Sequence, residues 1–422
     1  MPRRRKRTPI WVIPAWYAAL ALLAALYLPR LEIALGLRID AGIDPASLVA
    51  MFSSIASGMI ALTGIVFSLT FVMVQFSATA YSPRLVLWIA REPVLWHSVG
   101  IFSATFLYAL GAISWVQRAH AGTGVPFFSA WLVIGLLVAS VGVFIALIQR
   151  MSLLQVYRML TFTADHGRRV IEESYPPLEA PPSLPPVESL GPLQPGRTVR
   201  YAGRPLTLQA LDLRELLELA TAAGAVLELR ASVGDTLVDG TTMLRAYGGR
   251  PIDEDKLRQA FFLGVDRTFE QDPKYAIRLV VDIAIKALSP AVNDPTTAVQ
   301  ALDQIEDLLL RLGRRRLEIG AVRDAGGALR LTIPYPSWDD FLTLAFDEIR
   351  HYGADSVQVM RRMKALAADL IAALPPERHA GLRRHQKRLD AQIAKTFDVA
   401  EEKQEASVED RQGLGVPRKA AG

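Results

Sequence analysis

The sequence predicts an α-helical membrane domain of four transmembrane helices, followed by a cytoplasmic α+β domain. The 422 residues are 51% hydrophobic and only 21% charged, and the apolar residues are concentrated before residue 150. Four charge-free segments in that half reach or approach the roughly 20 residues that a helix needs to cross the hydrocarbon core. After residue 195, short strands and amphipathic helices alternate, as expected of a soluble α+β domain.

Residues 1–9 form a basic cytoplasmic N-terminus, and residues 10–150 form the predicted membrane domain. Its spans are expected at about 10–28, 45–81, 94–116 and 125–148. Asp44 and Pro45 are typical of an N-cap and a first helical turn, and Ser82-Pro83 should end the second helix. A helix of this length measures about 55 Å, so it should project from the bilayer or bend near Gly58 or Gly64.

Basic residues predict the orientation, because cytoplasmic loops carry an excess of Lys and Arg. With the N-terminus inside, the inner segments carry eleven basic residues and the outer ones three. We therefore expect a multi-pass protein of the bacterial inner (plasma) membrane with both termini cytoplasmic. A cleaved signal peptide is the alternative, but the apolar run is long and no small-residue cleavage site follows it. The inner set is Arg3, Arg4, Arg5, Lys6, Arg7, Arg84, Arg91, Arg150, Arg158, Arg168 and Arg169; the outer set is Arg30, Arg38 and Arg118.

Composition narrows the classes of partner and chemistry. There is no cysteine, which excludes disulfides, thiol catalysis and thiolate metal sites. The isoelectric point is about 9.4, but much of the basic excess flanks the predicted spans. We therefore expect a lipid bilayer with anionic headgroups as the partner, and no nucleic acid. No Asp, Glu, Lys or Arg lies within the four expected spans, which argues against a pump or ion-coupled transporter.

The second span carries a stripe of small and hydroxyl-bearing residues at spacings of three and four, which places most of them on one helix face. Such a stripe either packs closely against another helix, within the chain or in a homo-oligomer, or it lines a water-filled path. The residues of this stripe are Ser54, Ser57, Gly58, Ala61, Gly64, Ser68 and Gln75.

Beyond the membrane, the helical pattern of the fourth span continues over residues 151–174 and predicts a stalk. Residues 175–195 are rich in proline and predict a semi-rigid linker. The α+β domain covers residues 196–400, with strands at 205–211 and 225–231, a hairpin turning at Gly326-Gly327, and helices at 337–352, 354–374 and 376–400. Turns at Gly234-Asp235 and Asp239-Gly240 resemble half of a lipoyl/biotinyl-like barrel, but the modified lysine of a carrier is absent. The polar residues 401–422 predict a disordered tail.

Four long motifs carry a family resemblance: VFSLTFVMVQFSATAYSPRLV, TFEQDPKYAIRLVVDIAIKALSP, SPAVNDPTTAVQALDQI and FDEIRHYGA. With these motifs the chain resembles the bacterial predicted membrane protein family known as domain of unknown function 2254, over roughly residues 10–375. The resemblance implies an inner-membrane protein with a cytoplasmic domain, and it brings no established activity.

The motif SPAVNDP and the two helices beside it contain a candidate cytoplasmic polar site. One interpretation is structural: a helix stop, Asp294 as the next N-cap with Pro295 in the first turn, and a ladder of ion pairs. The other is a polar pocket at a helix N-terminus, where free N–H groups attract an anion, although Asp294 would already occupy those donors. The candidate residues are Arg278, Asp282, Asn293, Asp294, Thr297 and Gln300.

No catalytic, metal or cofactor site is predicted. Glu348 and His351 have the E-x-x-H spacing of a metal site, but no second copy occurs. Phosphate-loop, nucleophile-elbow and dinucleotide motifs are absent. The sequence favours a membrane-anchored sensor or scaffold with a cytoplasmic ligand- or partner-binding domain. The alternative is an oligomeric channel-like or membrane-stress protein whose second helix lines the axis, and an enzyme is the least favoured class.

Overall fold

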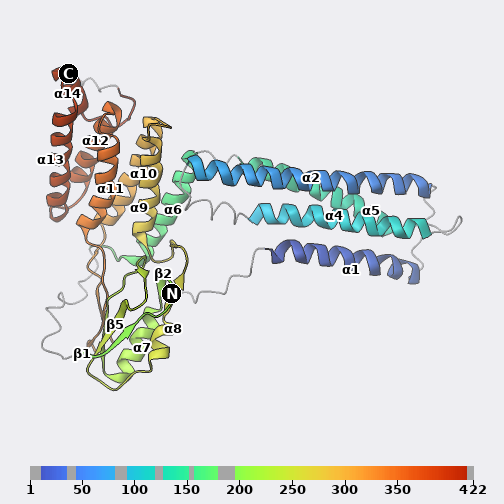
Figure 1. Cartoon of the computed structure of the whole chain (residues 1–422), viewed down its shortest axis with the longest axis horizontal. Helices are drawn as coiled ribbons and strands as arrows, with labels where there is room; N and C mark the ends of the chain where they lie inside the picture. Colours follow the sequence, from blue (N-terminus) through green and yellow to red (C-terminus); the bar gives the residue numbers. More distant parts are fainter. Residues whose placement is uncertain are drawn as a thin grey trace. The chain divides into compact units, whose positions relative to one another are not determined.

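The computed structural model of the chain describes residues 11–35, 44–80, 93–118, 127–151, 156–178 and 195–415. The chain divides into two compact units, Met1–Gln155 and Val156–Gly422. In Figure 1, the described part of the first unit is built from long helices, and the second combines helices with strands. The prediction of a helical membrane domain followed by a mixed α/β domain is confirmed.

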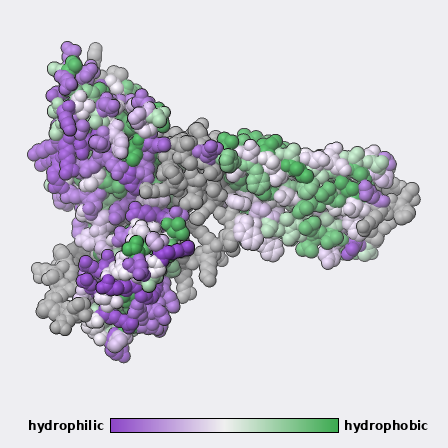
Figure 2. All heavy atoms as spheres, viewed as in Figure 1, coloured by the Kyte–Doolittle hydropathy of each residue, from purple (hydrophilic) through white to green (hydrophobic). Residues whose placement is uncertain are grey.

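The described part of the first unit contains four helices that are long and apolar enough to cross a membrane. They are α1 (Val12–Ala34), α2 (Pro45–Ala80), α4 (Pro93–Arg118) and α5 (Phe127–Met151). Figure 2 shows hydrophobic residues over much of the visible surface of these helices. Helix α2 is continuous through Gly58 and Gly64, and its 36 residues correspond to about 54 Å.

Helix α4 is the centre of the first unit, because α1, α2 and α5 all pack against it. The large buried side chains Phe52, Phe102 and Tyr108 belong to this core. Polar contacts also join the helices. The hydroxyls of Thr105 and Ser140 lie 2.9 Å apart, and the indole N–H of Trp115 donates to the carbonyl of Ala25 at 2.8 Å. Such contacts satisfy polar groups that would otherwise face hydrocarbon.

Helix α1 differs from the expectation, because it continues through Pro29 to Ala34. Its candidate span, Val12–Glu32, therefore includes Arg30 and Glu32, and the prediction of spans without charge is wrong for this helix. A proline is tolerated in membrane helices where neighbouring groups satisfy the freed carbonyl. The expected first span ended at Leu28 because Pro29 and Arg30, which follow it, are typical of the end of a membrane span.

Glu32 is only 3% exposed and caps the N-terminus of α5. Its carboxylate accepts hydrogen bonds from Phe128 N at 3.0 Å, Ser129 N at 2.8 Å and Ser129 Oγ at 2.5 Å. Free N–H groups and the positive end of the helix dipole both favour a carboxylate there. The buried charge therefore has a structural partner, and it joins the first span to the fourth.

The second unit contains two sheets. A five-stranded sheet has the order β1-β5-β3-β8-β7, and a three-stranded sheet has the order β4-β2-β6. Strand β8 pairs in parallel with β3, with Leu227 opposite Leu331, so the late hairpin completes the early sheet. The predicted hairpin turn is confirmed, with Gly327 at φ +81°. The strands are β1 (Pro195–Arg200), β2 (Leu206–Leu211), β3 (Val226–Leu229), β4 (Thr236–Leu237), β5 (Thr242–Tyr247), β6 (Phe261–Gly264), β7 (Ala321–Arg323) and β8 (Leu329–Thr332).

The helices of the second unit follow the sequence signals closely. Helix α7, between β2 and β3, begins after the N-cap Asp212 and ends at the left-handed Gly224, as typical capping residues predict. The described α-helices are α6 (Val156–Ser174), α7 (Leu213–Ala223), α8 (Glu254–Gln259), α9 (Pro273–Ala287), α10 (Pro295–Gly313), α11 (Trp338–Tyr352), α12 (Val357–Ala373), α13 (His379–Thr396) and α14 (Ala400–Ser407).

The predicted stalk is part of the second unit. Helix α6 packs against α9 and α10, and its residues Leu160, Ala164 and Ile171 are fully buried. Gly167 permits the close approach, because a Cβ there would lie 2.8 Å from the Cβ of Ala276. An amphipathic helix needs a partner for its apolar face, and α9 and α10 supply it. Most of the predicted Pro-rich linker, residues 179–194, lies outside the described residues.

The segment expected to be a disordered tail is ordered as far as the structure describes it. Residues 400–415, which we call the C-terminal strap, form α14 and a hydrogen-bonded loop. Asp410 is 4% exposed, and its carboxylate accepts from the backbone N–H groups of Gln412, Gly413 and Gly415 at 2.8–3.1 Å. The prediction was based on polar composition alone. Composition does not show that Asp410 accepts hydrogen bonds from Gly413 and Gly415 within this loop. Residues 416–422 lie outside the described chain.

Candidate functional site

Helices α9 and α10 begin in the same way. Each has an Asp N-cap followed by Pro at its first position, and the cap angles agree: φ −121° and ψ 86° at Asp272, φ −117° and ψ 81° at Asp294. The Asp294 carboxylate accepts from Thr297 N at 3.0 Å and from Thr297 Oγ1 at 2.5 Å. Asp294 therefore occupies the place that an anion would take at this helix N-terminus.

The turn between the two helices is closed by its own backbone. Val292 N and Asn293 N donate to the carbonyl of Ser289 at 3.0 and 2.9 Å, and Asp294 N donates to Ala287 at 2.8 Å. Asn293 has a φ of +48°, and it is the only non-glycine residue among the described ones with a positive φ. Asn tolerates this region better than most residues. Residues 290–293 are exposed, so the SPAVNDP turn is a rigid surface feature.

Arg278 joins α9 to α11. Its Nη1 and Nη2 donate to the two carboxylate oxygens of Glu348 at 2.6 and 2.7 Å, and its Nε donates to Asp282 at 2.7 Å. This bidentate geometry is the strong form of an ion pair. The Arg278 guanidinium lowers the pKa of Glu348, and hydrogen bonding to Glu348 outweighs burial and raises the pKa of Arg278.

The six candidate polar residues therefore fall into two groups. Arg278 pairs both with Asp282 and with Glu348 of α11, whereas Asn293, Asp294 and Thr297 form the turn and cap of α10. Gln300 is half-buried on α10. The arrangement supplies structural ion pairs and a helix cap. No group of three His, Asp or Glu that could hold a metal occurs among the described residues.

No local pattern in the sequence indicates the role of a buried arginine, Arg362 on α12. It is 5% exposed and pairs with Asp303 at 2.9 Å and Glu306 at 2.5 Å on α10. Asp303 and Glu306 are three residues apart and share a helix face, but the arginine comes from a helix more than 50 positions later. Only the tertiary fold brings these residues together.

Three segments contact the helices α9 to α12 near one end: the turn between α9 and α10, the turn between α11 and α12, and the C-terminal strap. Gly353 packs beside Leu288, because a Cβ there would lie 3.3 Å from a methyl group of Leu288. In the strap, Gly413 lies against Val299, and Arg361 Nη1 donates to Gly415 O at 2.8 Å. Each loop, or the helix end beside it, carries an exposed apolar residue: Val292 at 45%, Tyr352 at 53% and Leu414 at 71%.

The predicted stripe of small and hydroxyl-bearing residues lies on α2, and we call it the α2 stripe. It faces away from the rest of the described first unit. Its residues Ser54 to Ser68, and Gln75, are exposed, whereas Phe52, Ile55, Met59 and Val66 on other faces of α2 are buried. A Cβ added at Gly58 or Gly64 would meet nothing within 4 Å. The stripe is therefore not a packing seam within one chain, as far as the structure describes it.

The glycines of the first unit that pack closely against another helix lie in α4, for which no such contact was predicted. A Cβ at Gly111 would lie 2.5 Å from the Cβ of Ala25, and one at Gly100 would lie 2.7 Å from the Tyr17 ring. Small residues allow helix backbones to approach closely in membranes. The sequence offered a signal, since Gly100, Ala104 and Ala112 are small, but the stripe in the second span was denser.

Comparisons with known proteins agree with the fold and bring no activity. The uncharacterized protein Rv1290c of Mycobacterium tuberculosis is 27% identical over 377 residues, which covers 85% of this chain and 70% of the relative. The uncharacterized protein Mb1321c of Mycobacterium bovis matches with the same identity and coverage. No solved structure matches the chain. The model of the predicted membrane protein family DUF2254 matches residues 7–369, and the chain belongs to this family.

Proposed function

We propose that this protein is a membrane-anchored sensor or scaffold whose second unit binds a ligand or a partner. The observation that supports this most is how the first unit uses its polar groups. Among its described buried side chains only Glu32 carries a charged group, and this carboxylate is engaged as a helix cap. Such a unit suits anchoring better than proton or ion coupling, which needs charged groups that are free to change partners.

The end formed by the SPAVNDP turn, the start of α12 and the strap is the proposed binding surface. It combines exposed apolar side chains, Val292 and Leu414, with backbone that is held by internal hydrogen bonds. Rigid loops with exposed apolar residues lose little conformational entropy when a partner binds. The ion pairs of Arg278 and Arg362 lie between helices, and we assign them to the stability of this scaffold.

An oligomeric channel-like or membrane-stress protein is the second proposal, and the exposed α2 stripe favours it. Copies of α2 facing one another around a symmetry axis would cover Gly58 and Gly64 and place hydroxyl groups at the centre. Two measurements separate the proposals: the mass of the protein in mild detergent, and ion flux in liposomes with and without membrane tension. A sensor or scaffold gives no flux. Flux that changes in Ser68→Asn would overturn the first proposal.

We also propose that the protein lies in the bacterial inner membrane with both termini in the cytoplasm, on the basis of the basic residues that flank the spans. Reporter fusions after Arg38 and Arg118 should report the periplasm, and a fusion after Arg158 the cytoplasm. A cytoplasmic signal after Arg118 would contradict this orientation.

A further inference from the structure

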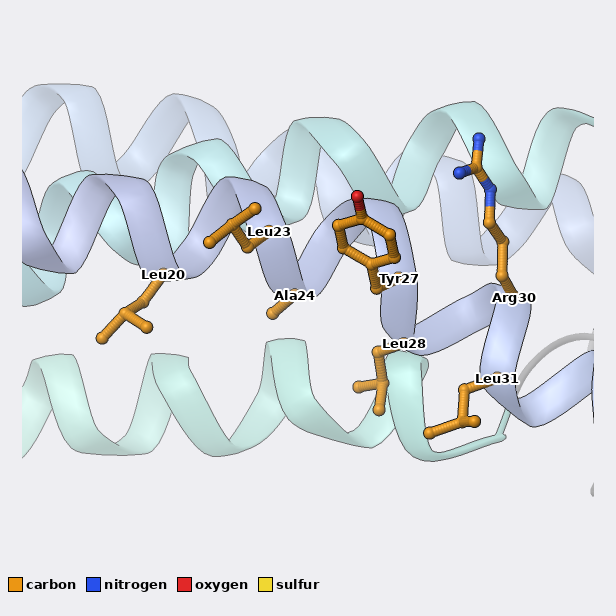
Figure 3. Close-up of a pocket in the computed structure, with 7 residues that line it drawn as sticks. All are labelled: Leu20, Leu23, Ala24, Tyr27, Leu28, Arg30 and Leu31. Carbon is orange, nitrogen blue, oxygen red and sulfur yellow. The ribbon is translucent and has the colours of Figure 1, made fainter.

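A concave groove runs along the outer surface of α1. It is lined by Leu20, Leu23, Ala24, Tyr27, Leu28, Arg30 and Leu31, which Figure 3 shows as sticks. The floor is formed by Ala24 and Leu28, which are half-buried and pack against the core of the first unit. Leu20, Leu23 and Leu31 are 50–59% exposed and form the sides. The small Ala24 makes the surface hollow, because longer side chains stand on both sides of it.

One end of the groove is polar. Tyr27 and Arg30 are three residues apart, so they lie on neighbouring positions of one helix face. The Arg30 guanidinium lies 5.8 Å from the ring centre of Trp115. No carboxylate pairs with Arg30 in the described part of the chain, and the nearby Glu32 is engaged at the N-terminus of α5. A membrane arginine near a helix end extends toward the headgroups, where Tyr and Trp are also enriched.

We propose that this groove binds one anionic phospholipid. An acyl chain lies over Ala24 and Leu28, and the headgroup phosphate accepts hydrogen bonds from Arg30 and from the Tyr27 hydroxyl. The apolar floor fits a hydrocarbon chain, and the cation without a carboxylate partner fits a phosphate, so the two ends of the groove match the two ends of a lipid. A second protein helix would leave the Arg30 charge without a counter-ion. An anionic lipid binds better than a zwitterionic one, whose amine partly neutralises the phosphate.

The test is native mass spectrometry of the full chain in detergent, titrated with phosphatidylglycerol or phosphatidylcholine of identical acyl chains. We expect about a fivefold preference for phosphatidylglycerol, since one basic residue contributes about 1 kcal/mol toward anionic lipid. In Arg30→Gln the preference should fall to about one. In Ala24→Leu, which fills the floor, occupancy by both lipids should fall.

Leu26→Phe is the matched control, because Leu26 is 49% exposed on the same helix and does not line the groove. It should bind both lipids like the unchanged protein. A preference for phosphatidylglycerol that persists in Arg30→Gln would overturn the proposal. So would a loss of binding in Leu26→Phe equal to that in Ala24→Leu. If Ala24→Leu does not fold, the Arg30→Gln comparison still decides, because it changes an exposed side chain.

Discussion

The described helices of the first unit leave many large apolar side chains exposed, whereas the second unit buries most of its own. In the first unit, Trp16, Phe71 and Val138 are 64–69% exposed, while Ala25, Ala109 and Ala112 are at most 5% exposed. In the second unit, Phe341, Leu216 and Leu308 are fully buried. Lipid solvates large apolar side chains as well as a core does, so helix contacts in a membrane select residues that allow close approach. Hydrophobicity alone therefore does not separate inside from outside in the first unit, whose core combines small residues such as Ala109 with large ones such as Phe52 and Phe102.

The largest expected effect comes from bulk placed in the close contact between α1 and α4. Gly111→Leu should destabilise the first unit by about 1–3 kcal/mol, because Ala25 leaves no room for a side chain. Gly64→Leu should be neutral in a monomer, since nothing lies within 4 Å of that position. Thermal unfolding in detergent measures both variants. A loss in Gly64→Leu would show that the α2 stripe packs against another copy, and a neutral Gly111→Leu would contradict the helix packing described above.

In the second unit, ion pairs between side chains connect neighbouring helices, whereas in the first unit glycines allow helices to pack closely. Arg278→Ala should cost about 2 kcal/mol, because two half-buried carboxylates lose a bidentate partner. A double-mutant cycle with Glu348→Gln should give a coupling nearer 1 kcal/mol, since Glu348 is 45% exposed and solvent screens the pair. Arg214→Ala breaks a pair that is exposed on both sides and serves as the neutral control. Equal losses in Arg278→Ala and Arg214→Ala would contradict this comparison.

The buried His385 makes the second unit sensitive to pH. Burial lowers its pKa from the usual 6.5; Asp347 opposes this effect, while Arg388, Arg384 and Arg350 reinforce it. The unfolded chain then binds a proton more readily, so stability should fall as pH drops below about 6.5 toward the folded pKa, by at most about 1.4 kcal/mol per pH unit.

Chemical denaturation between pH 7.5 and 5 measures this slope. His385→Phe should reduce it, and His351→Gln, which changes an exposed histidine, should leave it unchanged. A slope that is unaffected by His385→Phe would assign the pH dependence to other groups.

The smallest expected effect is local to the strap. Gly413 has φ +64° and lies directly against Val299. Gly413→Ala should therefore loosen residues 408–415 by about 1 kcal/mol and speed their amide exchange about fivefold, with little change in global stability. Leu414→Ala, at a residue that is 71% exposed, is the control. Unchanged exchange in Gly413→Ala would mean that the strap is held elsewhere.

The features that could be predicted from the sequence are those that depend on residues close together in the chain. Apolar length predicted four spans, Asp294 and Pro295 predicted the start of α10, and paired glycines predicted the hairpin before β8. Contacts between distant positions left no local pattern. The pairing of β3 with β8, the docking of α6 on α9 and α10, and the Arg362 network all depend on tertiary packing.

The candidate site shows the same limit. Spacing placed Arg278 and Asp282 on one helix face, but it could not show that this face meets Glu348 of α11 and not the turn before α10. The groove on α1 was not predicted, because its hollow shape depends on which residues of α1 the rest of the unit covers.

The cap that Glu32 provides for α5 has a consequence for biogenesis. The two residues that donate to its carboxylate follow it by 96 and 97 positions, so they do not yet exist when the first helix is made. Until the fourth helix is made, the polar side chain of Glu32 must remain in water or at the headgroup level, because hydrocarbon offers its carboxyl group no hydrogen-bond partner. The C-terminal end of α1 can therefore reach its final position only after α5 has been made. The first unit is assembled in an order that depends on when each helix enters the bilayer.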